Sequence, residues 1–317
     1  MRILKSAEWA FQSLCPVGGV LAITLIASSP IQGQVRGVYP VGMNATNSGV
    51  TPEAGITYSN LFIFFSRDEQ KDSEGNTVAT GQNSIMMDLN SFVWVSEKRI
   101  HALGGAIFSA SATLPVANNS LTSDVVGTLS AGGGFADSFY QPVILGWRKK
   151  RADIRAIYGF LAPTGRFEAG ANNNVGSGYW TSVLSSGQTF YLSENKATAI
   201  SAFEMYEFHG TQEGTGVHPG QTLNLDYSLT QVFPLKAGLR LQIGLVGYGQ
   251  WQMTNKYGPT ITSEEAEAHY KVNGMGLAAN ALFPGRKASI GIKYFHEFEC
   301  RSTYQGYTLQ ITAAIAF

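Results

Sequence analysis

The sequence predicts an all-β protein, a transmembrane antiparallel up-and-down β-barrel of about twelve strands with N- and C-termini on the periplasmic side. Three observations predict it. Residue types alternate with period two over segments of about 10 residues, longer than the roughly 5–6 residues of strands in soluble proteins. Short and long connections alternate along the chain, as in outer-membrane barrels. The last alternating segment ends on the aromatic Phe317.

Composition agrees with a membrane barrel. Only 14 % of the 317 residues are charged, against about 25 % in soluble domains. The 22 basic and 22 acidic residues balance, so the charge gives no hint of a nucleic-acid partner or an acidic substrate. Aromatic residues make up 12 % and glycines number 36, which fits many turns and the aromatic girdles of a barrel.

Residues 1–33 are predicted to be a cleaved signal peptide. Arg2 and Lys5 give a basic start, and the apolar run 17–27 is too short for a bilayer, which needs about 20 residues. Cleavage is expected near residues 33–34 or just after 27–29; an uncleaved anchor is the alternative. The mature chain then keeps one cysteine, Cys300, which excludes an internal disulfide and a cysteine-based zinc site.

The next segment, 34–55, is rich in Gly, Asn, Thr and Pro, so we expect it to be irregular. It either hangs in the periplasm or folds into the lumen, where it would be a plug. From residue 56 to residue 317 the chain is predicted to form the barrel. The expected strands are 56–65, 84–95, 101–112, 138–148, 153–162, 179–192, 197–208, 221–233, 238–252, 270–282, 288–298 and 305–317.

The alternation is clearest in the last segment, where one face carries apolar residues in phase with Phe317. These residues are Tyr307, Leu309, Ile311, Ala313 and Ile315. Short connections follow the second strand and every second strand after it, and long ones such as 66–83 and 113–137 lie between them. An even strand count places both ends of the barrel on the short-turn side, which is periplasmic in such proteins.

No constellation predicts catalysis. The five histidines lack the spacing of metal ligands, and no nucleophile elbow is present. We therefore expect no enzyme activity, no metal and no cofactor.

Charged residues within strands indicate the lumen instead. A charged side chain on the lipid face is costly, about 2–4 kcal/mol for Arg or Lys at the midplane, so we expect such residues to point inward. They would form an ion-pair network that holds the pore shut, or line a solute path. The residues are Asp88, Arg155, Glu204, Asp226, Arg240 and Lys293. Twelve strands suit a narrow or partly plugged conduit, between the filled eight-stranded barrel and the open porin.

Several short motifs resemble an outer-membrane family described as "putative MetA-pathway of phenol degradation". They are Gly37-Val38-Tyr39-Pro40-Val41-Gly42, Gln141-Pro142 with Leu145-Gly146-Trp147, Pro163-Thr164-Gly165-Arg166-Phe167 and Tyr206-Glu207 with His209-Gly210. The resemblance implies a channel distantly like the transporters of fatty acids and toluene, in which an N-terminal segment plugs the lumen. The terminal Phe317 looks like the signal that the barrel-assembly machinery reads.

These features favour a channel for small hydrophobic or aromatic solutes, with outer-membrane lipid and the assembly machinery as its other partners. A non-transport barrel, whether adhesin, structural protein or enzyme, is the alternative that the long loops suggest. A soluble all-β periplasmic protein is a third possibility, disfavoured by strand length and low charge.

Overall fold

The computed structural model describes residues 36–123, 127–171 and 173–317, so the predicted signal peptide lies outside the described residues. The described chain is almost entirely β. Its strands are β1 (Gly55–Lys71), β2 (Thr77–Ile100), β3 (Ala106–Ser123), β4 (Gly127–Phe135), β5 (Ser138–Arg148), β6 (Ala152–Ala162), β7 (Thr181–Tyr191), β8 (Thr198–His209), β9 (Thr222–Pro234), β10 (Arg240–Gln252), β11 (Lys271–Phe283), β12 (Ala288–Arg301) and β13 (Thr303–Ala316).

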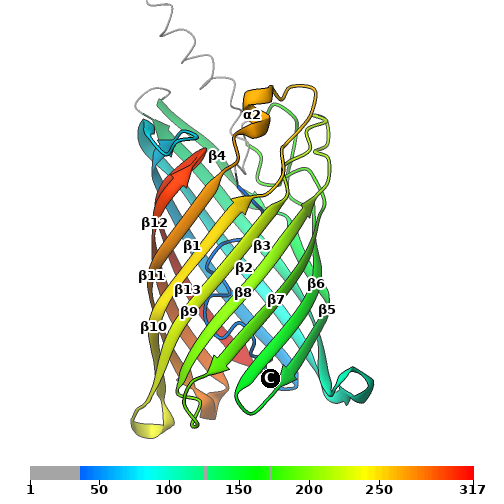
Figure 1. The fold of residues 1–317 in the computed structure, drawn as a ribbon, viewed down its shortest axis with the longest axis vertical. Coiled ribbons are helices and arrows are strands. Elements are labelled where there is room, and N and C mark those ends of the chain that lie inside the picture. The colour runs from blue at the N-terminus through cyan, green and yellow to red at the C-terminus, as the bar shows by residue number, and fades with distance from the viewer. Residues whose placement is uncertain (1–35, 124–126, 172) are drawn as a thin grey trace, which may run out of the picture.

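Twelve of these strands close into one antiparallel ring (Figure 1). Each strand pairs with the next along the chain, except that β3 pairs with β5. The ring closes between the first and last strands, where Thr57 of β1 pairs with Ala316 of β13. Strand β4 stands outside the ring and pairs with the far half of β3. The predicted barrel and its strand number are confirmed.

The first three strands are longer than predicted. Residues 66–83 and 113–137 were expected to be long loops, but most of them continue β1, β2 and β3 and form β4. In these stretches polar residues occupy both faces of the strands, as in the run Ser66 to Lys71. A strand that extends into water needs no apolar face, so period-two hydrophobicity does not reveal it.

The two ends of the barrel differ in the length of their connections. Short turns lie at the end where the chain terminates (Figure 1), and three of them are 3-10 turns, at His101–Leu103, Lys236–Gly238 and Pro284–Arg286. Longer loops lie at the opposite end, where α2 (Ser263–Glu267) is the one α-helix of the described residues. That the short-turn end faces the periplasm stays a prediction.

Helix α2 begins with a capping box. Thr262 accepts a hydrogen bond from the backbone N–H of Glu265, whose carboxylate accepts one from the backbone N–H of Thr262 (2.9 Å). The bonds from Thr262 lower the pKa of Glu265, because they favour its charged form. No helix among the described residues has the length and apolar character to cross a membrane.

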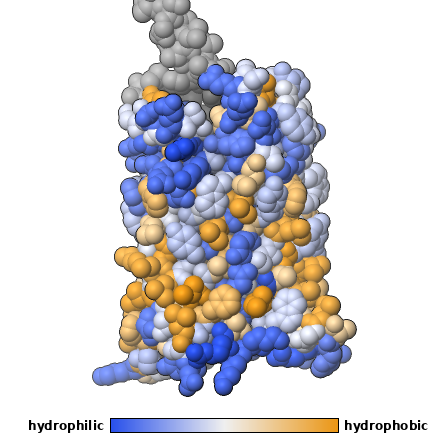
Figure 2. All heavy atoms as spheres, in the orientation of Figure 1, coloured by the Kyte–Doolittle hydropathy of each residue, from blue (hydrophilic) through white to orange (hydrophobic). Residues whose placement is uncertain are grey.

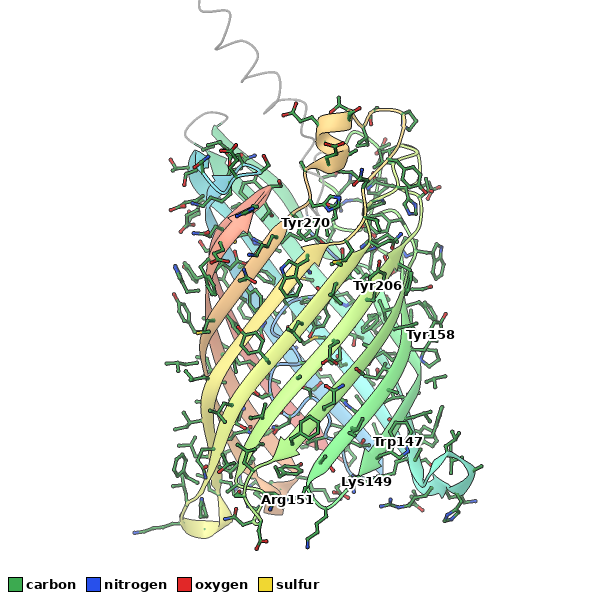
Figure 3. All side chains as sticks on the ribbon, viewed as in Figure 1. Trp147, Lys149, Arg151, Tyr158, Tyr206 and Tyr270 are labelled. Atoms are coloured by element: carbon green, nitrogen blue, oxygen red, sulfur yellow. The ribbon has the colours of Figure 1, made fainter. Side chains whose placement is uncertain are left out.

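The outer wall carries an apolar belt. Figure 2 shows hydrophobic residues gathered around the middle and lower part of the visible wall, with hydrophilic residues above and below it. Tyr158 and Trp147 lie along the wall in Figure 3, and Lys149 and Arg151 project from the short-turn end. This distribution is the one that a lipid bilayer selects in a transmembrane barrel.

Candidate functional site in the barrel lumen

Alternate residues of each ring strand point into the barrel, and on β9 the inward set is polar. Asn224 and Asp226 are fully buried, whereas Leu229 on the opposite face is 45 % exposed. Burial alternates in the same way along β8, where Met205 is buried and Phe208 is exposed. The lumen is therefore lined by polar residues and by buried apolar residues such as Met205, whereas large apolar residues on the opposite faces are exposed.

Residues 36–54 occupy this lumen as an extended, turn-rich segment without helix or strand (Figure 1, blue). Such a segment has no backbone ladder of its own, so its N–H and C=O groups need other partners. Side chains of the ring strands provide them. We call residues 36–54 the lumen segment.

The first anchor of the lumen segment is an ion pair near the long-loop end. Arg36 contacts both carboxylate oxygens of Glu297 on β12, at 2.6 and 3.0 Å. The Arg36 Nε–H also donates to the hydroxyl of Thr303, at the start of β13 (3.1 Å). Both charged side chains are buried. A two-bond contact between a guanidinium and a carboxylate fixes orientation as well as charge.

The second anchor is the buried carboxylate of Glu207 on β8. It accepts hydrogen bonds from the backbone N–H groups of Val38 (2.9 Å) and Tyr39 (3.0 Å). The side-chain amide of Asn224 donates to the same carboxylate at 2.7 Å. Two consecutive backbone donors of the lumen segment are thus satisfied by one side chain.

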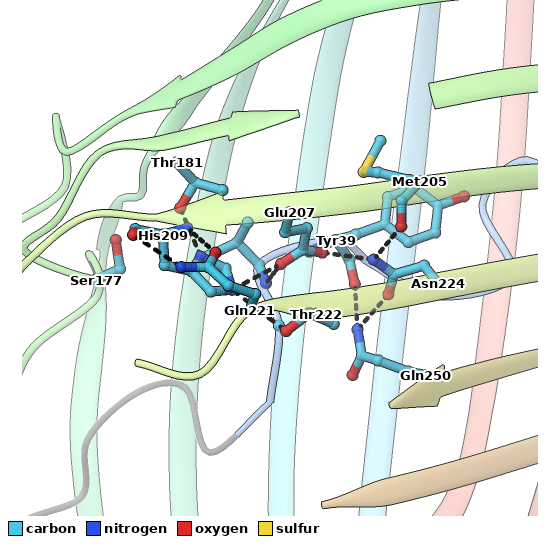
Figure 4. A network of polar contacts seen from close by, with 12 residues as sticks. Tyr39, Ser177, Thr181, Met205, Glu207, His209, Gln221, Thr222, Asn224 and Gln250 are labelled. Carbon is cyan, nitrogen blue, oxygen red and sulfur yellow. Dashed lines mark hydrogen bonds and ion pairs between the residues drawn. The ribbon is translucent and has the colours of Figure 1, made fainter. Parts of the chain in front are cut away.

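A polar network surrounds Glu207 (Figure 4). The ring of His209 lies 3.2 Å from Glu207 and 2.9 Å from the hydroxyl of Thr181. The hydroxyls of Thr222 and Tyr270 are 2.7 Å apart, and the phenol accepts a hydrogen bond from the backbone N–H of Gly37 (2.7 Å). The network joins β7, β8, β9 and Tyr270, which precedes β11, to the lumen segment, and satisfied buried networks of this kind are rigid.

The third anchor holds one turn of the lumen segment from both sides. Asp226 accepts from the backbone N–H groups of Gly42 (2.8 Å) and Asn44 (3.0 Å) and from the hydroxyl of Tyr39 (2.5 Å). The ammonium of Lys293 donates to the carbonyls of Gly42 (2.8 Å) and Met43 (2.7 Å). The peptide groups of this turn therefore lie between a buried carboxylate and a buried ammonium.

Two arginines hold the segment near the short-turn end. Arg155 on β6 donates to the carbonyl of Ser48 (2.8 Å). Arg148, the last residue of β5, donates to the carbonyls of Thr51 (2.9 Å) and Pro52 (2.7 Å). The anchors thus follow the lumen segment from its beginning to the point where β1 starts.

The inward face of β1 and β2 is different. Three cross-strand rungs, Phe65 with Ile85, Ile63 with Met87 and Leu61 with Leu89, are apolar. These six residues form one hydrophobic cluster, against which Met43 of the lumen segment packs. Ile85 and Met87 keep accessible surface, and since they face inward that surface lies inside the barrel. We call the six residues the apolar track.

The comparisons decide the family. The model described as "Putative MetA-pathway of phenol degradation" matches residues 67–313. The chain belongs to this family. The resemblance predicted from the sequence is therefore confirmed. A search of curated proteins finds no match.

Two solved structures share the fold of this MetA-pathway family member. One is the COG4313 outer membrane channel from Pseudomonas putida F1, with a TM-score of 0.69, 14 % identity, and coverage of 86 % of this chain and 98 % of that one. The other is the β domain of the Bordetella autotransporter BrkA, with a TM-score of 0.50, 11 % identity, and coverage of 84 % and 100 %. The fold is that of outer-membrane barrels.

The barrel places the predicted lumen residues in three different environments. Asp226, Lys293 and Arg155 face the lumen and hold the lumen segment. Arg240 is the first residue of β10, at the short-turn rim, and is exposed.

Asp88 and Glu204 do not face the lumen, and the expectation for these two residues is corrected. Glu204 shares its strand face with the exposed Ile200 and Phe208 and accepts hydrogen bonds from Ser186 (2.7 Å) and Gln188 (3.0 Å) on β7. The neighbouring strand therefore supplies the donors that lipid lacks, and an acidic residue on the lipid face costs less than Arg or Lys.

Asp88 on β2 likewise lies on the outer face and is hydrogen-bonded by the neighbouring strand. It alternates with the buried Leu89 and shares its face with the exposed Met86 and Phe92. The side-chain amide of Asn60, on β1, donates to its carboxylate. Side chains of the neighbouring strands thus donate hydrogen bonds to both carboxylates on the outer face of the barrel.

The sequence reasoning missed Arg36, Glu207, His209 and Glu297, although all four are buried in the lumen. The alternation of residue types could have identified Glu207 as inward-facing, because it lies between the apolar Tyr206 and Phe208. No group of three possible metal ligands occurs within the ranges that the structure describes.

Two loops meet at the long-loop end of the barrel. His218 and Tyr257 form an isolated β-bridge, and their rings stack with centroids 4.6 Å apart. Burial and the nearby imidazole of His209 lower the pKa of His218, since both disfavour the protonated form of His218.

Proposed function

We propose that this protein is an outer-membrane channel for small hydrophobic or aromatic solutes, in which the lumen segment acts as a plug. The observation that carries the proposal is the apolar track beside a segment held by polar anchors. A soluble or purely structural barrel gains nothing from apolar side chains that keep accessible surface inside the lumen. A pathway for apolar solutes requires such a surface.

The division of contacts supports a plug that leaves one side of the lumen available. The anchors from β6, β8, β9 and β12 bind backbone groups of the lumen segment. On the side of β1 and β2, Met43 packs against the apolar track. A small solute that moves along the track would displace an apolar side chain, and the charged anchors would remain in place.

Export and assembly belong to the same proposal. Residues 1–33 serve as the cleaved signal peptide, and the exposed Phe317, 72 % accessible at the end of the barrel, serves as the signal for the assembly machinery. The short-turn end then faces the periplasm, and a solute enters at the long-loop end.

The test is uptake by liposomes with an outer leaflet of lipopolysaccharide, which slows the passive entry of apolar solutes. The full-length mature barrel is expected to increase uptake of phenol and toluene over protein-free vesicles. A pentose, which is polar and of similar size, serves as the control and should show a smaller increase. If uptake of every aromatic solute equals that of empty vesicles, the channel proposal is wrong.

An adhesin or structural barrel is the alternative, and the long β1–β2 and β3–β4 sheets favour it, since they continue past the ring on the long-loop side. Shortening the β1–β2 extension between Asp68 and Gly81 separates the two functions. Loss of surface binding with unchanged aromatic uptake would support the alternative.

A further inference from the structure

One basic residue stands at the head of the apolar track. Arg67 on β1 is two residues beyond Phe65 and on the same inward face, with its guanidinium carbon 4.6 Å from the centre of the Phe65 ring. Its cross-strand partner on β2 is Asn83. A solute that enters at the long-loop end therefore meets Arg67 before it meets the apolar rungs below.

The buried carboxylate of Glu297 has no acceptor site left for a hydrogen bond from Arg67. Glu297 is already bound by both terminal nitrogens of Arg36. It also accepts hydrogen bonds from the hydroxyl of Tyr248 (3.0 Å) and the backbone N–H of Gly306 (3.1 Å). Each oxygen of Glu297 therefore has two donors, which fills the acceptor sites of a carboxylate. This part of the lumen holds two guanidinium groups and one carboxylate.

Arg67 has no acceptor of its own in the described part of the chain. Its Nε is enclosed without a hydrogen-bond partner, and so is the side-chain oxygen of Asn83 opposite. The terminal nitrogens of Arg67 are not enclosed, and the residue keeps accessible surface. The terminal nitrogens are therefore the donors of this guanidinium that an entering anion can reach, and a carboxylate can accept two parallel hydrogen bonds from such a fork.

We propose that Arg67 and the apolar track form a binding site for a hydrophobic monocarboxylate, aromatic or aliphatic. The carboxylate pairs with the terminal nitrogens of Arg67, whose planar fork matches it. The apolar body lies on Phe65, Ile85 and Met87. One uncompensated positive charge above three apolar rungs fits one negative charge on an apolar tail, and does not fit a doubly charged phosphate ester or a polar sugar. The proposal rests on the proposed function, since it names the solute class.

The test is equilibrium dialysis of the full-length mature protein in detergent against benzoate, benzyl alcohol and benzylammonium. These three probes share a ring and differ in charge. Benzoate is expected to bind at least about tenfold more tightly than either of the others. Arg67→Met should weaken benzoate binding about tenfold and change benzyl alcohol binding less than about twofold. Arg67→Lys, which keeps the charge, should lose less than about fivefold.

Arg286→Met is the matched control, because it removes the same charge from the exposed turn at the opposite end of the barrel. It should leave benzoate binding unchanged. The proposal is overturned if Arg67→Met binds benzoate as wild type does, or if Arg286→Met weakens it equally. Should Arg67→Met fail to fold, the wild type decides alone: benzylammonium binding as tightly as benzoate overturns the site.

The outcomes separate this site from the channel. Uptake of neutral aromatic solutes without Arg67-dependent binding of benzoate overturns the carboxylate site alone. Arg67-dependent binding of benzoate in a barrel that raises no uptake overturns the channel and leaves the site in place.

Discussion

The inward faces of β8–β12 and of β1–β2 enclose the same lumen but differ in their polar contacts. The first face presents buried Glu207, Asp226 and Lys293, which bind backbone atoms of the lumen segment, beside an apolar cluster that packs on the same segment. The second presents the apolar track, against which Met43 of that segment packs. Buried charges need fixed partners, whereas apolar contacts are non-directional. The face of β8–β12 is therefore suited to fixing the lumen segment, and the face of β1–β2 is suited to the movement of a solute along it.

Removing an anchor should have the largest effect. Asp226→Leu removes the acceptor of two backbone N–H groups and of the Tyr39 hydroxyl, and each buried donor left without a partner costs about 1–3 kcal/mol of unfolding free energy. We also expect higher ion conductance, because the lumen segment loses its central contact. Urea unfolding in detergent and planar-bilayer recordings measure both.

Asp226→Asn is the control for that change, since it keeps one acceptor oxygen and should show a smaller loss. Wild-type stability and conductance in Asp226→Leu would show that the carboxylate does not hold the segment.

Steric displacement of the lumen segment should be the next largest effect. A Cβ at Gly49 would lie 1.9 Å from the carbonyl oxygen of Asp153 on β6. Gly49→Val should push the lower segment off the wall and break the bond between Ser48 and Arg155, at a cost of about 1–3 kcal/mol. Thermal unfolding and conductance report the change.

Gly285→Ala provides the comparison, because nothing lies within 4 Å of a Cβ at that position. A Gly49→Val barrel indistinguishable from Gly285→Ala in both measurements would contradict the close contact.

The apolar track should affect solutes without affecting stability as strongly. Met87→Gln places an amide on the track and should reduce phenol and toluene uptake about fivefold, equivalent to roughly 1 kcal/mol. Met86→Gln is the matched control, because Met86 is 41 % exposed on the outer face of the same strand. Equal effects of the two variants would mean that solutes do not follow the inner face of β2.

The smallest effect concerns pH at the loops. Because the folded protein lowers the pKa of His218, its contact stabilises the loops above the unfolded value of about 6.5 and is lost as the pH falls through the folded pKa. The protection of residues 253–262 in hydrogen exchange, taken relative to the intrinsic exchange rate at each pH, should therefore fall between pH 7.5 and 5. His218→Gln should remove most of this dependence; an unchanged pH profile in that variant would exclude His218 as its source.

The sequence predicts the ring well because lipid imposes a simple pattern. Leu309, Ile311 and Ile315 alternate with small or polar residues along β13, and the bilayer requires that regularity. The requirement for apolar residues at alternate positions ends at the membrane surface. The extension of β1 past Ser66 has polar residues on both faces, so its strand structure comes from pairing with β2 and β13, which no local pattern shows.

The lumen site could be predicted only in part. Asp226 and Lys293 follow from alternation, since their neighbours are apolar. Glu204 shows the limit, because the rule that charges avoid lipid is only a preference, and Ser186 and Gln188 on the next strand solvate it. Glu204 and Glu207 are an odd number of residues apart on one strand, so they face opposite sides. Only the register with β7 and β9 shows how each carboxylate is satisfied.

The position of Arg36 constrains the order in which the lumen segment is placed and the ring closes during assembly. Arg36 binds Thr303 near the long-loop end, while the same segment enters β1 at the short-turn end, so the chain crosses the length of the lumen before the first strand begins. The ring then closes by pairing β1 with β13, the last strand to be synthesised. A folded domain fused ahead of Arg36 could not follow the segment through the lumen. A barrel assembled with such a fusion should therefore form with its lumen segment outside.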